Sequence, residues 1–491
     1  MPQPQRRLPV NAAPHYIAAI RRPKPSGIVR CTLDLDLQRR AEQMVADHFA
    51  VLHRVDPAQV AMVIIENESG AVRAMVGSRD FQTCQVNGAL RYHDCGSTLK
   101  PFLYAAGIDR RLFTAATLLP DTPDAVRDAY SDYDPHNFVQ AHAGPVRVRE
   151  ALDNSLNVPA VVAVSRIGAR KAFDAIGDWG IRFDRPLEKA GAGFILGNLG
   201  VRLLDLTSAF SGIARGGLAS PPRLLAEDRM ALHRRISPAT AEILIDILCD
   251  NSARLLSFGP HSALAFQTRV ACKTGTSAGF RDGWAVGFTR EHTVGVWVGN
   301  VDGSPMDHIT SIASAAPLWR RMMDDLLLAD HPLPLPTLPR TRICAFTGLL
   351  PCAHSPATLD ELFLPGTEPK ESAGDWFAPD GHPLLPGEYA GWVASPDNRV
   401  MATVRPDANS LAILSVRDEA VFVLDGNVPR AQQQLELQAS LQSGVSWRVN
   451  GEPLSPDTTG RVLWPLQVGR WTVEAATTGE RARVNFVVRG E

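Results

Sequence analysis

The sequence predicts an α/β protein of several domains, in which an antiparallel sheet with a helical subdomain is followed by a small β-sandwich. Between residues 59 and 298, runs that alternate apolar and polar residues flank a stretch, 167–250, where glycine-rich turns separate amphipathic helices. From about residue 400, short alternating runs recur between turns, as in a sandwich. The 491 residues are enough for two or three domains that each bury a core.

Composition divides the chain into four segments. Residues 1–28 are rich in proline and arginine and have no helical or strand periodicity, which is typical of a connector. Residues 29–330 hold the sheet and the helical subdomain. The alternating prolines of His331-Pro332-Leu333-Pro334-Leu335-Pro336 end that domain, and 331–399 are expected to form a linker rich in proline and glycine. The β-sandwich is expected at 400–491.

The order of the elements follows from periodicity and turn residues. Asp, Pro and Gly mark residues 114–146 as a loop. The expected helices are Gln38 to His53, one that starts at Gly96, Val146 to Ser155, Leu203 to Arg215 and Pro238 to Asp250. The expected strands are Gln59 to Ile65, Ala71 to Val76, Arg269 to Thr276, Asp282 to Phe288, Thr293 to Val298, Ala420 to Leu424, Gln434 to Ala439, Ser446 to Val449, Trp471 to Ala475 and Val484 to Val488.

Charge and hydropathy exclude two classes of protein. The formal net charge of −2 provides no basic field, so a nucleic-acid partner is not expected. The longest apolar runs, such as Val158 to Val164, are far shorter than the roughly 18–20 residues that span a bilayer, so we expect a soluble chain. The seven cysteines have no metal-ligand spacing, and Cys344 and Cys352 alone are near enough for a local disulfide.

The sequence Gly96-Ser97-Thr98-Leu99-Lys100 places a hydroxyl and an amine three residues apart on one face of a probable helix. Serine needs a neighbouring base to act as a nucleophile, and lysine can be that base only while it is neutral. Arginine cannot replace it, because arginine stays protonated. The chain has only 6 lysines among its 50 basic residues, and Lys100 and Lys273 lie in candidate catalytic motifs.

Two further motifs follow Ser97 and Lys100 along the chain: Ser155-Leu156-Asn157 and Lys273-Thr274-Gly275-Thr276. Each is weak alone, since Ser155 could simply cap a helix and Asn157 could satisfy a turn. Their order, and their positions on a helix start, a loop and a strand, match the motif set of serine β-lactamases and penicillin-binding proteins. A class A β-lactamase would also need the glutamate of E-x-x-L-N between the second and third motifs, and the sequence has none.

The chain resembles the class A penicillin-binding proteins, in particular their 1C type. The resemblance is carried by Leu8 to Ala12, Gly96 to Phe102, Ser155 to Ala160, Lys273 to Ser277, Phe280-Arg281-Asp282 and Val294 to Asn300. It implies a penicillin-binding transpeptidase fold, like that of serine β-lactamases, and an immunoglobulin-like C-terminal sandwich. The family usually has proline where this chain has Cys95. Its members also carry a membrane anchor and a glycosyltransferase domain, neither of which we expect here.

The resemblance implies roles for the first two motifs. Ser97 Oγ would attack the carbonyl between two D-alanines, and Lys100 would accept its proton. Ser155 would relay a proton to the departing amine, and Asn157 would orient Lys100 and the substrate amide.

The third motif would bind the substrate. Lys273 would keep the site positive and attract a carboxylate, which Thr274 and Thr276 would bind through their hydroxyls. Gly275 would let the strand approach the ligand. The backbone N–H groups of Ser97 and Thr276 would form the oxyanion hole.

The function that the resemblance implies is D-alanyl-D-alanine transpeptidation of peptidoglycan stem peptides in the periplasm, with acylation by β-lactams and without a cofactor or a metal. A periplasmic macroglobulin or another cell-wall protein is a further candidate partner. Two alternatives stay open: a D,D-carboxypeptidase and a non-catalytic penicillin-binding sensor or scaffold. A Cys/His nucleophile made of His93 and Cys95 is disfavoured, because a buried structural cysteine explains that pattern better. Trp284 and Trp297 are expected to pack in the sheet.

Overall fold

The structure is a computed structural model of the chain. It describes residues 12–20, 28–51, 59–123, 125, 141–307, 309–404, 411, 413, 415–416, 420–424, 433–439, 444–457, 461–477 and 481–490. Most of the expected connector at 1–28, including residues 8–11 of the stretch Leu8 to Ala12, lies outside these residues, as does much of the expected loop at 114–146.

The chain folds into two compact units. The first consists of 1–117, 147–341 and 360–368, and the second of 118–146, 342–359 and 369–491. The boundaries expected at residues 330 and 399 do not mark this division, because the chain passes between the units several times. Hydrophobic periodicity identifies helices and strands from neighbouring residues. It does not indicate to which unit an element belongs when the chain passes back and forth between units.

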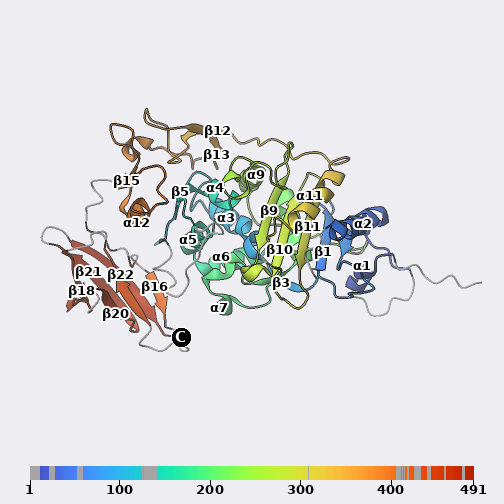
Figure 1. The fold of residues 1–491 in the computed structure, drawn as a ribbon, viewed down its shortest axis with the longest axis horizontal. Helices are drawn as coiled ribbons and strands as arrows, with labels where there is room; N and C mark the ends of the chain where they lie inside the picture. Colours follow the sequence, from blue (N-terminus) through green and yellow to red (C-terminus); the bar gives the residue numbers. More distant parts are fainter. Residues whose placement is uncertain are drawn as a thin grey trace, which may run out of the picture. The chain divides into compact units, whose positions relative to one another are not determined.

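A five-stranded antiparallel sheet forms the centre of the first unit, as predicted (Figure 1). Its order is β2 (Val72–Val76), β1 (Gln59–Glu66), β11 (His292–Gly299), β10 (Asp282–Phe288) and β9 (Ala271–Thr276). The register places Gly275 beside Trp284, and Trp284 beside Trp297. Among the residues that the structure describes, β9, which carries the third motif, is therefore an edge strand of this sheet.

Helices cover both faces of this sheet. The helix α8 (Leu203–Ala214) packs on one face, where a Cβ at Gly295 would lie 2.1 Å from Thr207 Oγ1. The helices α2 (Leu35–Val51) and α11 (Ala315–Leu326) share a hydrophobic core with the other face. There a Cβ at Gly287 would lie 2.4 Å from Trp319 on α11. Glycine on the strands thus lets helices approach closely from both sides.

The stretch 167–250, predicted to be a helical subdomain, contains α8 and three further helices, α6 (Ala169–Gly177), α7 (Leu187–Ala190) and α9 (Pro238–Leu248). Ser237 caps α9, since its Oγ accepts a hydrogen bond from Thr240 N at 3.1 Å. The helices α3 (Lys100–Asp109), α4 (Val148–Asp153), α5 (Val158–Ile167) and α10 (Leu255–Phe258) begin outside that stretch. The remaining elements of this unit are α1 (Pro14–Ala19), η1 (Gly96–Leu99), η2 (Ala192–Leu196), η3 (Ala278–Phe280), β3 (Tyr92–Asp94), β6 (Gly200–Arg202), β7 (Leu218–Ala219) and β8 (His233–Arg234).

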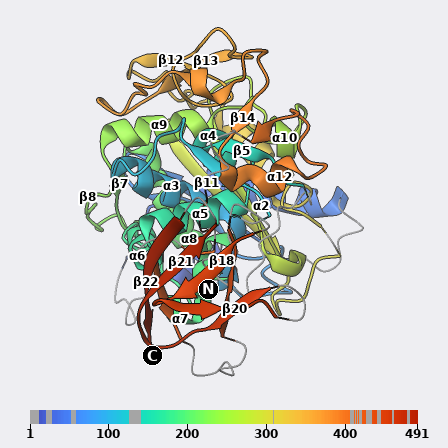
Figure 2. The same cartoon turned by 90° about the vertical axis from the view of Figure 1, so that its left-hand side faces the viewer.

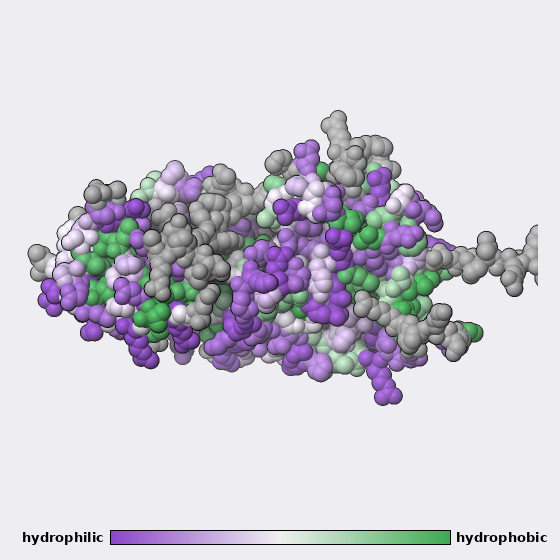
Figure 3. All heavy atoms as spheres, turned by 90° about the horizontal axis from the view of Figure 1, so that it is seen from below, coloured by the Kyte–Doolittle hydropathy of each residue, from purple (hydrophilic) through white to green (hydrophobic). Residues whose placement is uncertain are grey.

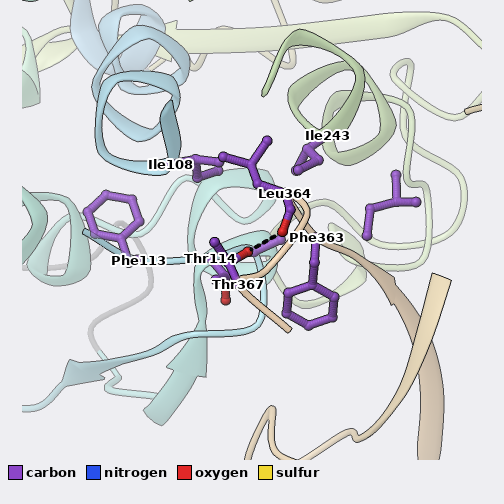
Figure 4. A pocket seen from close by; sticks show the side chains of 9 residues that line it. Ile108, Phe113, Thr114, Ile243, Phe363, Leu364 and Thr367 are labelled. Carbon is purple, nitrogen blue, oxygen red and sulfur yellow. Dashed lines mark hydrogen bonds between the residues drawn. The ribbon is translucent and has the colours of Figure 1, made fainter. Parts of the chain in front are cut away.

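The C-terminal end of α3 is anchored in an apolar environment. Side chains of α3, of α9 and of the segment 362–367 surround a small pocket there (Figure 4). Thr367 Oγ1 donates a hydrogen bond to Leu364 O at 2.8 Å between two residues that line this pocket. The lining residues are Ile108, Phe113, Thr114, Ala115, Ile243, Leu362, Phe363, Leu364 and Thr367.

The second unit contains the predicted β-sandwich. A five-stranded sheet has the order β16 (Ala420–Val423), β22 (Arg481–Arg489), β21 (Gly469–Ala476), β18 (Ser446–Val449) and β19 (Glu452–Leu454), and β18, β21 and β22 run side by side in Figure 2. A second sheet pairs β17 (Gln434–Leu437) with β20 (Val462–Pro465). Both sheets share one core that includes Trp447, Trp464 and Phe486.

The stretch 331–399, expected as a linker, contains short elements of its own. They are β12 (Arg340–Cys344), β13 (Thr358–Leu362), η4 (Ala373–Trp376), β14 (Leu384–Leu385), η5 (Gly387–Tyr389) and α12 (Ala390–Val393). Three short strands lie elsewhere in the chain: β4 (Leu118–Asp121), β5 (Gly144–Arg147) and β15 (Thr403–Val404). A small hydrophobic cluster around buried Tyr389 and Trp392 forms a core in this stretch. The high proline content had led us to expect a linker without a core. Cys344 and Cys352 are both free thiols.

Hydrophilic side chains dominate the face seen in Figure 3, with smaller hydrophobic patches between them. None of the helices in the described residues is long and apolar enough to cross a bilayer.

A buried ion cluster fixes α4, the helix that leads to Ser155. Arg149 donates to Glu361 Oε2 at 2.7 Å, to Asp246 Oδ2 at 2.9 Å and to Asp250 Oδ2 at 3.1 Å. Glu361 is completely buried. Because buried carboxylates are costly without a partner, Arg149 fastens α4 to α9 and to the segment of Glu361.

We expect Arg149→Ala to lower the free energy of unfolding by roughly 3–5 kcal/mol, because it removes the two hydrogen bonds that the fully buried Glu361 carboxylate accepts from this guanidinium. Arg170→Ala is the matched control. Its partners are Glu188 and Asp174, and all three side chains are more than half exposed, so the loss in Arg170→Ala should be below about 1 kcal/mol. Chemical denaturation of both variants measures the difference. Equal losses of unfolding free energy would show that the buried cluster stabilises the fold no more than the exposed ion pairs do.

Candidate active site

Ser97 lies in the 3₁₀ turn η1, which continues directly into α3. Pro101, in the first turn of α3, needs no N–H donor there, so it helps to start the helix. Gly96 adopts φ +54°, a left-handed conformation that favours glycine. Ser97 is partly buried, whereas Lys100 is completely buried. The predicted helix start is therefore present, with the serine in its tighter first turn.

Lys100 reaches from α3 to the connection between α4 and α5. Its Nζ donates hydrogen bonds to Ser155 O at 2.7 Å, Leu156 O at 2.9 Å and Asn157 Oδ1 at 2.8 Å. Three acceptors match the three N–H donors of an ammonium group. The structure thus brings the first and second motifs together.

The connection that holds Ser155 and Asn157 has a strained backbone. Ser155 adopts φ +60°, which is uncommon for a residue other than glycine. The neighbouring Asn154 holds it in place, since its Nδ2 donates to Ala253 O at 2.6 Å and its Oδ1 accepts from Ser257 N at 2.9 Å. Surrounding structure that over-determines such a conformation is typical of functional sites.

Lys273 joins the third motif to the second. Its Nζ donates to Ser155 Oγ at 2.8 Å and to Thr274 O at 2.9 Å. Ser155 Oγ accepts this bond, so its own proton is left for another acceptor. Burial lowers the pKa of Lys273 to about 7, although nearby Asp153 acts in the opposite direction. The charge of Lys273 therefore changes near neutral pH.

Two charged residues near Lys273, Asp153 and Arg254, were not predicted from the sequence. Burial raises the pKa of Asp153 to about 7, while Arg254 counteracts this rise from 3.7 Å. Arg254 Nη1 also lies 2.6 Å from the sulfur of Cys272, the residue before Lys273. Asp153 stands two residues before Ser155, which is the only hint that the sequence offers.

Glycine allows β9 to touch the turn of the nucleophile. A Cβ at Gly275 would lie 2.5 Å from Cys95 O, 2.8 Å from Thr98 Cγ2 and 3.2 Å from Ser97 N. A Cβ at Gly96 would lie 2.7 Å from Thr276 N, and one at Gly197 would lie 2.0 Å from Gly96 Cα. Gly275 was predicted to admit a ligand, and the structure places it against the turn of Ser97 itself.

Thr274 is buried, and the hydroxyl of Thr276 has a protein partner. Thr276 Oγ1 donates to Ser311 Oγ at 2.9 Å and accepts from Ser311 N at 3.1 Å. Ser311 could not be predicted from the sequence patterns, because it precedes α11 (Ala315–Leu326), a helix that we did not predict. To bind a ligand, the Thr276 hydroxyl must turn away from Ser311.

The residues considered for other chemistry are structural. Burial raises the pKa of the Cys95 thiol and lowers the pKa of His93 to about 3, so the pair cannot supply a thiolate and an imidazolium. Trp284 and Trp297 are fully buried in the sheet, as predicted. In the part of the chain that the structure describes, no group of three or more His, Cys, Asp or Glu could hold a metal ion.

Two family models match the chain. The model described as the penicillin binding protein transpeptidase domain matches residues 60–324. The chain belongs to the penicillin-binding protein transpeptidase family. The model of the Penicillin-Binding Protein C-terminus Family matches residues 401–486, the region of the β-sandwich.

Curated relatives agree with this assignment to the penicillin-binding proteins. Penicillin-binding protein 1C of Escherichia coli (strain K12) is 33% identical over 312 residues, which are 62% of this chain and 39% of the relative. Penicillin-binding protein 1A of Pseudomonas aeruginosa is 26% identical over 407 residues, 69% of this chain and 48% of the relative. The chain thus spans less than half the length of these two relatives.

Solved penicillin-binding proteins share the fold. Penicillin-binding protein 1A from Haemophilus influenzae has a TM-score of 0.56 at 22% identity, over 64% of this chain and 54% of that one. PonA1 from Mycobacterium tuberculosis has a TM-score of 0.53 at 23% identity, over 63% of this chain and 86% of that one.

We expect Gly275→Ala to lower the free energy of unfolding by about 1–3 kcal/mol, because its Cβ would collide with backbone as well as with Thr98. Gly177→Ala is the control, since its Cβ would meet only Phe183 at an ordinary 3.5 Å. Urea denaturation of the two variants compares them. A Gly275→Ala protein as stable as the control would contradict the close approach of β9 to the nucleophile turn.

Proposed function

We propose that this chain is a serine-type D-alanyl-D-alanine transpeptidase that cross-links peptidoglycan stem peptides through an acyl-enzyme on Ser97. The observation that carries the proposal is the chain of contacts from Lys100 to the 155–157 segment and from Ser155 Oγ to Lys273. These contacts join the three motifs of the transpeptidase family in one place. Membership of that family supports the coarser statement of a penicillin-binding serine acyltransferase.

The first step forms the acyl-enzyme. Ser97 Oγ attacks the carbonyl carbon between the two terminal D-alanines, and its proton passes to Lys100 Nζ. A neutral amine has two N–H donors and one lone pair. One of the three acceptors that surround Lys100 must therefore be released before the amine can take the proton, and the side chain of Asn157 is the most easily rotated of them.

The negative charge of the tetrahedral intermediate needs two donors. The backbone N–H groups of Ser97 and Thr276 are our candidates, because η1 and β9 meet at Gly96 and Gly275. Removing one such donor typically costs about 10²–10³ in rate. The glycine contacts thus bear directly on the reaction.

The leaving D-alanine needs a proton on its amine. Ser155 can relay to this amine the proton that Lys100 accepted from Ser97, while Lys273, which donates to Ser155 Oγ, keeps its charge. The protonated Lys273 also attracts the carboxylate of the ligand, which the hydroxyls of Thr274 and Thr276 then bind. A stem-peptide amine resolves the ester in a transpeptidase, whereas water resolves it in a carboxypeptidase.

We further propose the ligands of the site and the compartment in which the chain acts. Peptidoglycan stem peptides and β-lactams are the ligands of Ser97, and cell-wall synthesis in the periplasm is the setting. The β-sandwich has its own core and carries none of the proposed catalytic residues. We assign it a binding role towards a cell-wall protein such as a periplasmic macroglobulin.

We expect the chain to convert a stem pentapeptide into a cross-linked dimer with release of D-alanine when an acceptor amine is present. Mass spectrometry of the products decides between the alternatives. Hydrolysed tetrapeptide alone, with or without acceptor, would indicate a D,D-carboxypeptidase, and an unchanged pentapeptide would indicate a sensor or scaffold. Ser97→Ala is the control that should abolish both products.

Arginine substitutions should distinguish the two lysines. Lys100 must lose a proton, so Lys100→Arg should lower β-lactam acylation by about 10²–10⁴-fold. Lys273 needs only its charge, so Lys273→Arg should lose less. Because Lys273 is protonated below its pKa of about 7 and neutral above it, wild-type acylation by a carboxylate-bearing β-lactam should fall as pH rises through 7. That decrease should vanish in Lys273→Arg.

Second-order acylation rates measured between pH 5.5 and 9 check these expectations, after circular dichroism has shown that both variants are folded. Near-normal acylation by Lys100→Arg would contradict the assigned base. An equal collapse of both variants would contradict the separate roles.

A further inference from the structure

We propose that Asp282 is a positioning residue that holds the N–H groups of Ser97 and Thr276 in the geometry of the oxyanion hole. The inference rests on the proposed function. Asp282 belongs to the Phe280-Arg281-Asp282 stretch that the sequence analysis noted, yet the steps above give it no role. Its carboxylate connects the end of β9 to the strand that leads into the nucleophile turn.

The first connection is to Ser277, the residue directly after Thr276. Ser277 Oγ donates to Asp282 Oδ2 at 2.9 Å and accepts from Asp282 N at 2.9 Å. Ser277 N donates to Asp282 O at 3.0 Å. Three hydrogen bonds to one residue thus fix the end of β9, and with it the direction of the Thr276 N–H group.

The second connection runs through Trp297 to β3, the strand that precedes the nucleophile turn. Trp297 Nε1 donates to Asp282 Oδ1 at 2.8 Å, and the indole stacks on His93 with 3.7 Å between ring centroids. His93 Nδ1 itself lies 3.7 Å from Asp282 Oδ1. Since His93 stands four residues before Ser97, the carboxylate bears on the position of the turn.

Burial makes these contacts firm. Asp282 is only 6% exposed, and each carboxylate oxygen has its own donor. Burial raises the pKa of Asp282 to about 6, while the bonds from Trp297 and Ser277 act against this rise. At neutral pH the group is therefore mostly an anion held by two charge-assisted hydrogen bonds, which are about twice as strong as neutral ones.

The position of Asp282 matters because the two oxyanion-hole donors come from segments far apart in the sequence. Ser97 and Thr276 are separated by 179 positions, yet both N–H groups must point at one oxygen. Donors act on an oxyanion over about 2.7–3.1 Å, so a shift of a few tenths of an ångström weakens one of them. Asp282 has contacts towards both segments and touches no reacting atom.

The test uses the full chain and the acyl-enzyme that a ¹³C-carbonyl-labelled β-lactam forms on Ser97. The infrared stretching frequency of the ester carbonyl reports the hydrogen bonds that its oxygen accepts. We expect Asp282→Ala to raise this frequency and to lower the acylation rate by about 10–100-fold. Asp282→Asn should restore most of both, because an amide can still accept from Trp297 and donate to Ser277 Oγ.

Asp330→Ala is the matched control for lost stability. Asp330 is a buried carboxylate at the opposite end of the β10–β11 pair, where it accepts from Thr289 Oγ1 at 2.6 Å and contacts His292 Nδ1 at 2.9 Å. Its loss should destabilise the same strands and leave the carbonyl frequency and the acylation rate unchanged. Thermal melting of both variants allows the comparison at matched stability.

The possible outcomes separate this inference from the proposed function. A wild-type carbonyl frequency in Asp282→Ala, or an equal shift in Asp330→Ala, would overturn the positioning role alone. If Asp282→Ala does not fold, Ser277→Ala removes the side-chain bonds on the β9 side only, and it should give a smaller shift in the same direction. No shift in Ser277→Ala would then overturn the inference. A wild-type chain without an adduct on Ser97 would overturn the proposed function as well.

Discussion

The close approach of β9 to the turn of Ser97 is the constraint on which the rest of the site depends. Gly275 and Gly96 permit it, since a side-chain carbon on either would lie within 3 Å of backbone atoms of the other segment. The approach brings the N–H groups of two distant segments to one place. In the sheet order, β9 is the last strand, next to β10. Every proposed role, from the oxyanion hole to the carboxylate site, assumes that this spacing is kept.

Two buried lysines beside this contact have different hydrogen-bond partners. Lys100 is surrounded by three acceptors of the 155–157 segment, whereas Lys273 has a serine hydroxyl and one carbonyl. The poorer partners of Lys273 agree with its pKa of about 7, because burial is only partly compensated. One lysine thus organises the loop beside the nucleophile, and the other connects that loop to β9. Ser155, with its strained backbone, stands between them.

Sequence patterns were sufficient for elements whose cause is local. The strands β1, β10 and β11, the helices α8 and α9 and the three motifs follow from alternation, caps and spacing, and the structure agrees within a few residues. What depends on tertiary contact was not predictable. Ser311 and the Asp153–Arg254 pair act on motif residues from elements that carry no motif themselves. The short elements within 331–399 were not predicted, because the high proline content indicated a linker. The division into two units was not predicted, because the chain passes between the units several times.

The intact mass of the full chain after exposure to a β-lactam, followed by peptide mapping, tests directly whether Ser97 is the nucleophile. We predict a single, persistent adduct on Ser97, because the strained ring mimics the D-alanyl-D-alanine amide and the sequence offers no E-x-x-L-N glutamate to activate a deacylating water. The Ser97→Ala chain should stay unmodified. A folded wild-type chain without an adduct, or with the adduct on any other residue, would contradict the central claim that these three segments assemble an acyl-transfer site.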